Sequence, residues 1–462
     1  MPSTTQRATI LSIPNLRTRV SGRVIGPDDA DFDEARRVFI GGIDRRPAVI
    51  VRVADATDVA TVIGLARDTG LELAVRSGGH SSIGHGVSEG GIVLDLADMK
   101  SIDIDLEART AWAEAGLTAA EYSTAAWEHG LATGFGDTGS VGIGGITVGG
   151  GVGYLARKHG LTIDDLLAAD VVTADGELVR VDADHHPDLF WAIRGGGGNF
   201  GVVTRFQFRL HDVPSFFGGM LILPASPEVI AGFIAAAEAA PEELSTIANV
   251  MPCPPMPFVA EEHHGKLVVF ALMACAGDPA ASERALAPFR GLATPLADML
   301  KPMPYPEIYG PEDGDYHPLA ITRTMFVERI DLAAAQTIVE HLEASDAAMR
   351  VAQLRVLGGA MARVPADATA FAHRNSRIMV NIATFYEGPE DRDRRSAWVG
   401  ELAAALRQDD HGAYVNFLAD EGEERIRAAY PGATWDRLTE IKGRYDPANL
   451  FRLNQNIPPR AS

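Results

Sequence analysis

A histidine at the end of a short glycine loop is the residue of this sequence best placed to do chemistry. The loop runs from Arg76 to His80 and follows a predicted strand at residues 73–75. Glycines let backbone N–H groups turn toward a phosphate, and Arg76 would add positive charge beside it. His80 itself can serve as an anchor for a ligand or only as a hydrogen-bonding turn residue. The loop predicts a phosphate-containing ligand.

Two longer glycine-rich segments follow, at residues 134–153 and 194–204. Such a density of glycine allows backbone to pass close to an extended ligand. Both segments match the G-x-G-x-x-G dinucleotide fingerprint in letters. That fingerprint requires a strand before it and a helix beginning within it, and the second match leads into a predicted strand at 202–210. We therefore do not expect a Rossmann-type nucleotide site.

The elements that must position these loops alternate between short strands and helices. In the glycine-rich part, residues 48–53 read as a strand, and a helix at 58–68 follows with Thr57 as its predicted N-cap. A further helix is expected at 187–193.

From residue 216 to residue 409 glycine becomes sparse and the pattern changes. Strands at 220–223 and 267–273 alternate with alanine-rich helices at 227–239 and 332–344, which predicts an α+β lobe on an antiparallel sheet. The last stretch, 434–459, combines one amphipathic helix with a turn. The predicted fold class is α+β with two lobes, divided as residues 1–212, 213–409 and 410–462.

Composition restricts the class of partner. The 462 residues carry a formal net charge of -21, which disfavours nucleic acid and anionic membranes and leaves small molecules. There are 2 cysteines, Cys253 and Cys275, too few for a disulfide framework. The first residues lack the pattern of a secretory signal, so we expect a cytoplasmic protein. We expect it to be either a monomer or a homodimer. No metal site is expected, since the Glu261 to His264 run reads as a solvated loop.

Taken together, the glycine segments resemble the FAD-linked oxidases of the vanillyl-alcohol oxidase and p-cresol methylhydroxylase type, in their berberine-bridge-enzyme-like branch. The resemblance also covers the C-terminal runs 414–417, 442–449 and 454–459. It implies FAD as the cofactor, held covalently through His80 and wrapped by the three loops and the C-terminal tail. The cofactor-binding residues it implies are Arg76, Ser77, Gly78, Gly79, His80, Ser81, Thr138, Gly139, Val141, Gly142, Gly144, Gly145, Gly198, Asn199, Gly201, Val203, Asn454 and Asn456.

Two departures from the family pattern matter. Thr138 stands where many relatives attach FAD a second time through cysteine, so we expect attachment through His80 only and consider a bulky sugar substrate less favoured. Phe417 stands where some relatives carry a tyrosine base, and a phenyl ring cannot accept a proton. Tyr414 is then the candidate catalytic residue, although it can equally be a packing residue.

The resemblance implies an FAD-dependent oxidase that transfers a hydride from a small alcohol, amine or secondary metabolite and reduces oxygen to hydrogen peroxide. Val141, three positions after Thr138, is expected to leave the approach of oxygen open. The alternatives are a dehydrogenase with another electron acceptor, an oligosaccharide oxidase, and a flavin-binding scaffold without turnover. His85 is expected behind the site, whereas the sequence does not place His373 and Arg374.

Overall fold

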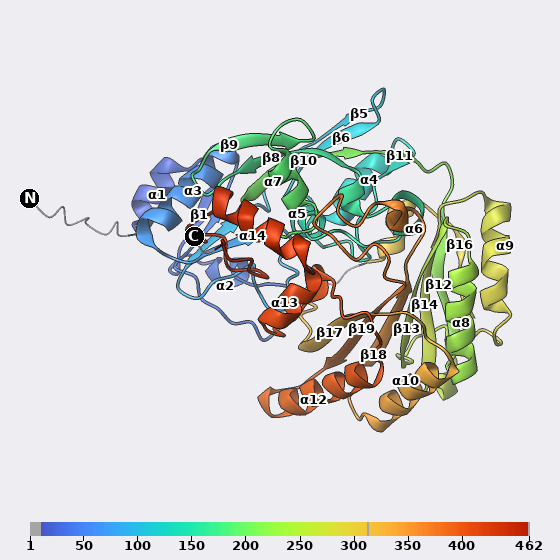
Figure 1. Cartoon of the computed structure of the whole chain (residues 1–462). Coiled ribbons are helices and arrows are strands. Elements are labelled where there is room, and N and C mark those ends of the chain that lie inside the picture. The colour runs from blue at the N-terminus through green and yellow to red at the C-terminus, as the bar shows by residue number, and fades with distance from the viewer. Residues whose placement is uncertain (1–10, 312–313, 461–462) are drawn as a thin grey trace, which may run out of the picture.

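The computed structural model describes residues 11–311 and 314–460 of the chain. It has two lobes, and the C-terminal segment runs back from the second lobe onto the first (Figure 1). The N-terminal residues on which the cytoplasmic expectation rests lie outside the described ranges.

The first lobe is built on two main sheets. The smaller sheet has the order β1-β2-β4-β3, with β2 and β3 parallel to β4. The larger sheet is antiparallel, with the order β5-β6-β10-β8-β9. A short pair, β7 and β11, lies beside them. The strands are β1 (Arg23–Ile25), β2 (Val49–Arg52), β3 (Leu73–Arg76), β4 (Ile92–Asp95), β5 (Ile102–Asp105), β6 (Thr110–Glu114), β7 (Leu131–Ala132), β8 (Leu166–Val172), β9 (Leu178–Asp182), β10 (Val202–Arg209) and β11 (His211–Asp212).

Helices connect these strands and cover the sheets. They are α1 (Ile13–Arg19), α2 (Phe32–Ala35), α3 (Ala56–Thr69), α4 (Ala119–Trp127), α5 (Ile143–Val148), α6 (Ala156–His159) and α7 (Pro187–Ile193), with a 3₁₀ turn η1 (Thr162–Asp164). The predicted strands at 48–53 and 73–75 and the helix at 187–193 are confirmed.

The predicted cap of α3 is wrong. Asp55, not Thr57, is the N-cap, and its carboxylate accepts hydrogen bonds from the backbone N–H groups of Thr57 and Asp58. Asp58 is buried and instead accepts from the N–H groups of Ser21 and Gly22. A carboxylate two residues earlier was the better capping group because it reaches the first unpaired N–H groups of the helix.

The second lobe is one antiparallel sheet with helices on its outer face (Figure 1). Its central order is β12-β14-β13-β18-β19-β17. The strands are β12 (Phe217–Pro224), β13 (Leu244–Pro252), β14 (Leu267–Cys275), β15 (Ala297–Asp298), β16 (Lys301–Pro302), β17 (Ala320–Val327), β18 (Arg350–Val356) and β19 (Ile378–Phe385). The helices are α8 (Pro227–Ala239), α9 (Pro279–Arg290), α10 (Leu332–Ala344), α11 (Ala360–Arg363) and α12 (Pro389–Ala405), with 3₁₀ turns η2 (Glu261–His263) and η3 (Tyr305–Tyr309).

Alternation along the strands decides what each face of this sheet does. On β19, Val380 and Ile382 are fully buried in a core shared with α8, α10 and α12. The residue between them, Asn381, projects from the opposite face, which faces the first lobe. The helices therefore cover one face, and the other face is available to form a site.

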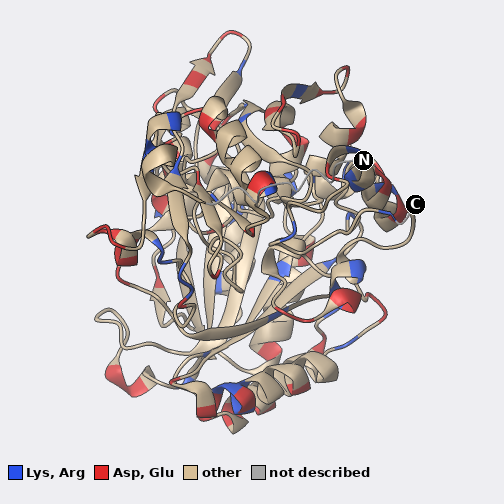
Figure 2. Ribbon diagram, turned by 90° about the vertical axis from the view of Figure 1, so that its left-hand side faces the viewer, with Lys and Arg blue, Asp and Glu red and all other residues tan. Residues whose placement is uncertain are grey.

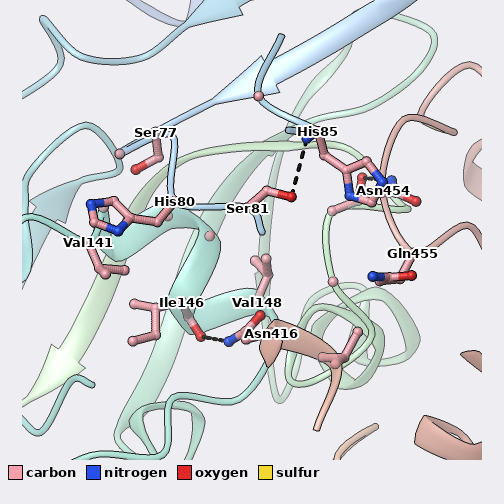
Figure 3. A pocket seen from close by; sticks show the side chains of 18 of the residues that line it. Ser77, His80, Ser81, His85, Val141, Ile146, Val148, Asn416, Asn454 and Gln455 are labelled. Atoms are coloured by element: carbon pink, nitrogen blue, oxygen red, sulfur yellow. Dashed lines mark hydrogen bonds between the residues drawn. The ribbon is translucent and has the colours of Figure 1, made fainter. Parts of the chain in front are cut away.

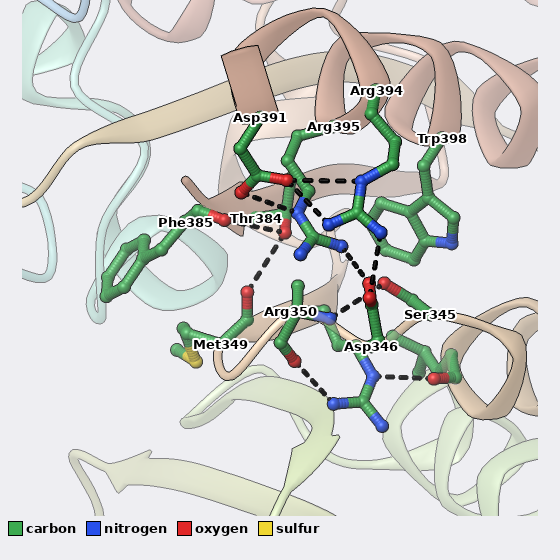
Figure 4. Close-up of polar contacts among 12 residues, drawn as sticks. Ser345, Asp346, Met349, Arg350, Thr384, Phe385, Asp391, Arg394, Arg395 and Trp398 are labelled. Carbon is green, nitrogen blue, oxygen red and sulfur yellow. Dashed lines mark hydrogen bonds and ion pairs between the residues drawn. The ribbon is translucent and has the colours of Figure 1, made fainter. Parts of the chain in front are cut away.

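Ion pairs fasten α12 to the loop that precedes β18 (Figure 4). Asp346 accepts from Arg394 at 2.8 Å and from Arg395 at 2.6 Å, and Arg395 also pairs with Asp391 at 3.0 Å. Hydrogen bonds from the two guanidinium groups lower the pKa of Asp346 to about 2.

The C-terminal segment is held to the first lobe by a buried charge pair. It contains η4 (Val415–Phe417), α13 (Glu423–Ala429) and α14 (Ala433–Tyr445). Lys442 on α14 and Asp446 are both fully buried and lie 2.7 Å apart. The Lys442 ammonium also donates to the backbone carbonyls of Asn199 and Phe451, at 2.7 and 2.9 Å. This one side chain links the helix, the third glycine segment and the C-terminal tail.

The α+β class with an antiparallel second lobe is confirmed, whereas the domain limits at 212 and 409 stay a prediction. Acidic residues outnumber basic ones by 62 to 41, and Figure 2 shows both signs spread over peripheral helices and loops of both lobes. Within the described ranges, no helix combines the length and the apolar composition needed to cross a membrane.

Candidate active site

A cavity of about 490 Å³ lies between the glycine loops of the first lobe, the sheet of the second lobe and the C-terminal tail. Figure 3 shows side chains from the first two glycine segments and from the C-terminal segment around this space, for example His80, Val141 and Asn454. Because the wall is drawn from segments far apart in the chain, the cavity exists only once both lobes and the tail have come together.

The first and second glycine loops pack backbone against backbone. A Cβ atom on Gly78 would lie 2.2 Å from the Gly142 nitrogen, and one on Gly142 would lie 2.0 Å from Oγ of Ser77. Neither position has room for a side chain. Ser77 in turn donates to the carbonyl of Ala115, the residue after β6, at 2.6 Å. This close packing lets the loops present backbone to the cavity.

The His80 ring lies on the cavity wall in a fixed orientation. Nε2 is 2.9 Å from the Ser140 hydroxyl. The imidazole also stacks on Phe39, with ring centroids 4.2 Å apart and planes 18° apart. A loop histidine held by a hydrogen bond and a stack is pre-positioned for a ligand bound beside it.

The Arg76 side chain does not have the expected role of supplying net charge to a phosphate. Its guanidinium is buried and pairs with Asp95 at 2.7 Å, and it also donates to the Ala35 carbonyl at 2.7 Å. The Asp95 carboxylate thus balances its charge. The first loop therefore offers backbone groups, and not this guanidinium, to a phosphate.

Tyr414 is buried, with its hydroxyl in a nest of N–H donors. The backbone N–H groups of Gly151 and Val152 donate to it at 3.0 and 3.2 Å, and Nδ2 of Asn416 donates at 2.9 Å. Burial raises the pKa of Tyr414 above its usual value, while the three hydrogen bonds oppose that rise. The phenol is protonated at neutral pH, yet the structure supplies donors that would stabilise its anion.

The sheet of the second lobe contributes one arginine and two amides, Gln353 and Asn381, to the opposite wall. Arg355 is buried and donates to the Asp137 carboxylate, next to Thr138. Its guanidinium also donates to the Gln353 side chain at 2.7 and 3.0 Å. The ring of Phe417 lies under the same guanidinium, 5.1 Å from its centroid. At position 417, where the sequence lacks the expected tyrosine base, the phenyl ring therefore packs against the Arg355 guanidinium.

The C-terminal tail closes the end of the cavity. Nδ2 of Asn454 donates to the carbonyls of Gly198 and Phe451, both at 3.1 Å. The Asn199 side chain is used internally, donating to the Gln455 carbonyl at 3.2 Å and accepting from the N–H of Ile457 at 2.9 Å. Oδ1 of Asn454 is buried without a hydrogen-bond partner among the described residues.

Most residues predicted for the cofactor are brought together on this wall, and so is Tyr414. Two do not line it: the Gly139 carbonyl instead accepts from the N–H of Ala120, and Oδ1 of Asn456 is buried without a hydrogen-bond partner among the described residues. His85, expected behind the site, lies on the wall itself, and burial lowers its pKa to about 4. The predicted residues on the wall are Arg76, Ser77, Gly78, Gly79, His80, Ser81, Thr138, Val141, Gly142, Gly144, Gly145, Gly198, Asn199, Gly201, Val203, Tyr414 and Asn454.

The residues that sequence reasoning left undecided lie elsewhere. His373 is buried and bonded to the Ala429 carbonyl at 3.0 Å, and Arg374 forms a bidentate pair with Asp164. Neither lines the cavity. The described residues include no group of three or more His, Cys, Asp or Glu arranged to hold a metal ion.

Sequence reasoning missed the wall contributed by the second lobe, namely Thr322, Gln353, Arg355 and Asn381. The signal was present as polar residues in the middle of apolar strands, such as Asn381 within Ile378–Phe385. Buried polar residues of this kind are costly unless they are paired or functional.

A cavity with glycine-rich backbone on one side and fixed polar side chains on the other is that of an enzyme that holds an extended cofactor beside a small substrate. Family models agree with this class: residues 47–182 match the FAD binding domain, and residues 413–458 match the "berberine and berberine like" family.

Relatives extend the match to the whole chain. An uncharacterised FAD-linked oxidoreductase of Bacillus subtilis, YgaK, is 31% identical over 455 residues, which covers 96% of this chain and 98% of that protein. The (R)-6-hydroxynicotine oxidase of Paenarthrobacter nicotinovorans is 31% identical over 460 residues, with the same coverage. The crystal structure of 6-hydroxy-D-nicotine oxidase from Arthrobacter nicotinovorans superposes with a TM-score of 0.85 at 29% identity and covers 100% of both chains. A berberine-bridge-like protein of Physcomitrella patens shares the fold, with a TM-score of 0.86 at 21% identity.

The chain belongs to the FAD-linked oxidoreductases of the berberine-bridge-enzyme-like branch. The resemblance seen in the sequence and the class of enzyme are thereby confirmed. The residues present also fit FAD, because the glycine contacts leave backbone exposed to the cavity and the tail offers Oδ1 of Asn454 as an unpaired acceptor.

Proposed function

We propose that this protein is an oxidase that holds FAD covalently through His80 alone and oxidises a small substrate at the expense of oxygen. The observation that carries the proposal is the fixed His80 ring on a cavity wall made of the predicted glycine loops. When bound there, FAD supplies a hydride acceptor for the substrate and a means of passing two electrons to oxygen, which yields hydrogen peroxide.

The protein's own residues divide the remaining work. The loops containing Gly78, Gly142 and Gly198 offer backbone groups to the cofactor, and Asn454 holds the tail against the third loop. Attachment through a single residue is supported by Thr138 on the wall and by the two cysteines, which are free thiols buried away from it. Free thiols are also in keeping with a cytoplasmic location.

Proton transfer is proposed to use Tyr414. Tyr414 lines the cavity, and the three N–H donors to its hydroxyl stabilise the phenolate that removes a proton from the substrate. Two tyrosines of the second lobe are away from the cavity: Tyr305 is buried in a separate aromatic cluster, and the partly buried Tyr309 packs against it. Phe417 shapes the wall without taking a proton.

Acid denaturation tests the covalent bond. Precipitated protein should stay yellow, and a proteolytic peptide containing His80 should carry the mass of the flavin. His80→Ala should lose flavin on denaturation yet still fold, because the backbone contacts of the loops remain. His85→Ala, which changes another histidine on the same wall, is the matched control and should keep the flavin. Complete release of flavin from the wild-type protein would rule out the covalent bond.

A further inference from the structure

The substrate-facing side of the second lobe carries a row of amides across neighbouring strands. The register pairs Asn249 on β13 with Gln353 on β18, Gln353 with Asn381 on β19, and Asn381 with Thr324 on β17. Directly paired residues project from the same face of a sheet. Gln353 and Asn381 line the cavity, so this row runs along its wall.

A chain of hydrogen bonds connects one end of the row, from Arg355 through Gln353 to Asn249. Arg355 donates to Oε1 of Gln353, Nε2 of Gln353 donates to Oδ1 of Asn249 at 2.9 Å, and Asn249 donates to the Phe270 carbonyl at 3.1 Å. Gln353 is therefore satisfied at both ends of its amide.

The other end of the row is unsatisfied. Oδ1 of Asn381 and Oγ1 of Thr324 are buried and have no hydrogen-bond partner among the described residues. A buried amide without a partner costs stability, and such groups recur where a ligand completes the bond. Asn381 is the member of the row that both lines the cavity and has an acceptor to spare.

The charge of the wall restricts what can bind there. Among the described residues that line the cavity, Asp137 is the single carboxylate, and Arg355 already neutralises it. A cationic amine would lose part of its hydration on entering the cavity and find no carboxylate left to pair with, which is unfavourable. The nearby Phe417 and Val152 side chains offer apolar surface instead.

We propose that Asn381 is a specificity-determining residue that selects substrates with an uncharged head group able both to donate and to accept a hydrogen bond, such as an alcohol or a carboxamide. The amide of Asn381 provides the complementary acceptor and donor. The body of the substrate packs on Phe417 and Val152. This inference rests on the proposed function because it takes the cavity face of the sheet as the substrate side.

Binding of two small probes to the flavin-loaded protein tests the inference without requiring turnover. Benzamide and benzylammonium share one ring and differ in charge and hydrogen bonding. Isothermal titration calorimetry should give benzamide the lowest Kd in the wild type, with benzylammonium weaker by about tenfold or more. Asn381→Leu, which keeps the branched shape of the side chain and removes the amide, should weaken benzamide about tenfold and leave the flavin spectrum unchanged.

A charge-bearing variant makes the test directional. Asn381→Asp places an unpaired carboxylate in the row and should reverse the order, so that benzylammonium binds better than benzamide. Asn375→Asp adds the same charge at an exposed position just before β19 and should leave the order unchanged. Asn381→Ala replaces Asn381→Leu if the larger side chain prevents folding.

The outcomes separate this inference from the proposed oxidase. Tighter binding of benzylammonium than benzamide by the wild type, or unchanged benzamide affinity in both Asn381→Leu and Asn381→Ala, would overturn the inference. The oxidase proposal is judged by a different measurement, the reaction of reduced protein with oxygen. A protein that fails that measurement but ranks the probes as expected keeps the amide row as its recognition element.

Discussion

Nδ2 of Asn416 lies 2.9 Å from the hydroxyl of Tyr414 and donates a hydrogen bond to it. The same Nδ2 also donates to the Ile146 carbonyl on α5 at 3.1 Å. Asn416 thus joins the C-terminal segment to the second glycine loop and positions the phenol at the same time. The tyrosine and the asparagine two residues later therefore act together: Asn416 orients the Tyr414 hydroxyl.

Replacing Tyr414 with phenylalanine should slow anaerobic reduction of the flavin by ~10²-fold or more, because the proposed base is lost. Since burial raises the pKa of Tyr414, the phenolate fraction is small at neutral pH. The wild-type rate of reduction should therefore increase with pH into the alkaline range, and Tyr414→Phe should lose that increase. Stopped-flow absorbance at several pH values measures both effects.

Phe417→Leu is the matched control for this experiment, because it alters the neighbouring ring without removing a titratable group. It should change substrate affinity and keep the pH dependence of the wild type. An unchanged rate in Tyr414→Phe would remove this phenol from the mechanism.

Breaking the buried pair of Lys442 and Asp446 should destabilise the protein strongly. Lys442→Met leaves the Asp446 carboxylate buried and unpaired, and such losses cost about 3–5 kcal/mol. The double variant Lys442→Met with Asp446→Leu should recover part of the loss, since no isolated charge remains. Urea unfolding followed by fluorescence measures both proteins. Equal stability of the single and double variants would show that the ion pair is not the cause.

The glycine loops could be located from the sequence because local patterns determine them. His80, Thr138 and Val141 were each identified from residues adjacent in the chain, and all three line the cavity. The opposite wall depends on cross-strand register: Gln353 meets Asn249, 104 residues away, only when β18 pairs with β13. No local period specifies that pairing. Likewise, nothing near Arg76 in the sequence indicated that Asp95 would take its charge.

The ion pairs of α12 should make stability depend on acid pH. The pKa of Asp346 is lowered from 3.8 to about 2, so the carboxylate contributes stability above pH 3.8 and loses that contribution as the pH falls toward about 2. Asp346→Asn should lower the Tm by about 1–3 °C at pH 7. The difference from wild type should shrink below about pH 4. Glu390→Gln, on the same helix but without an ion pair among the described residues, should show no such pH-dependent difference.

The reaction with oxygen should depend on the size of residue 141. Val141 lines the cavity beside the second glycine loop, and one added methylene at this position would narrow the space next to Gly142. We expect anaerobically reduced wild-type protein to be reoxidised rapidly by oxygenated buffer, with release of hydrogen peroxide. Val141→Leu should slow that reoxidation by about tenfold or more while anaerobic reduction by substrate stays near the wild-type rate, because tight interiors respond to a single methylene. Val148→Leu adds the same methylene elsewhere on the wall and serves as the control. Slow reoxidation of the wild type together with fast electron transfer to an artificial acceptor would replace the oxidase by a dehydrogenase.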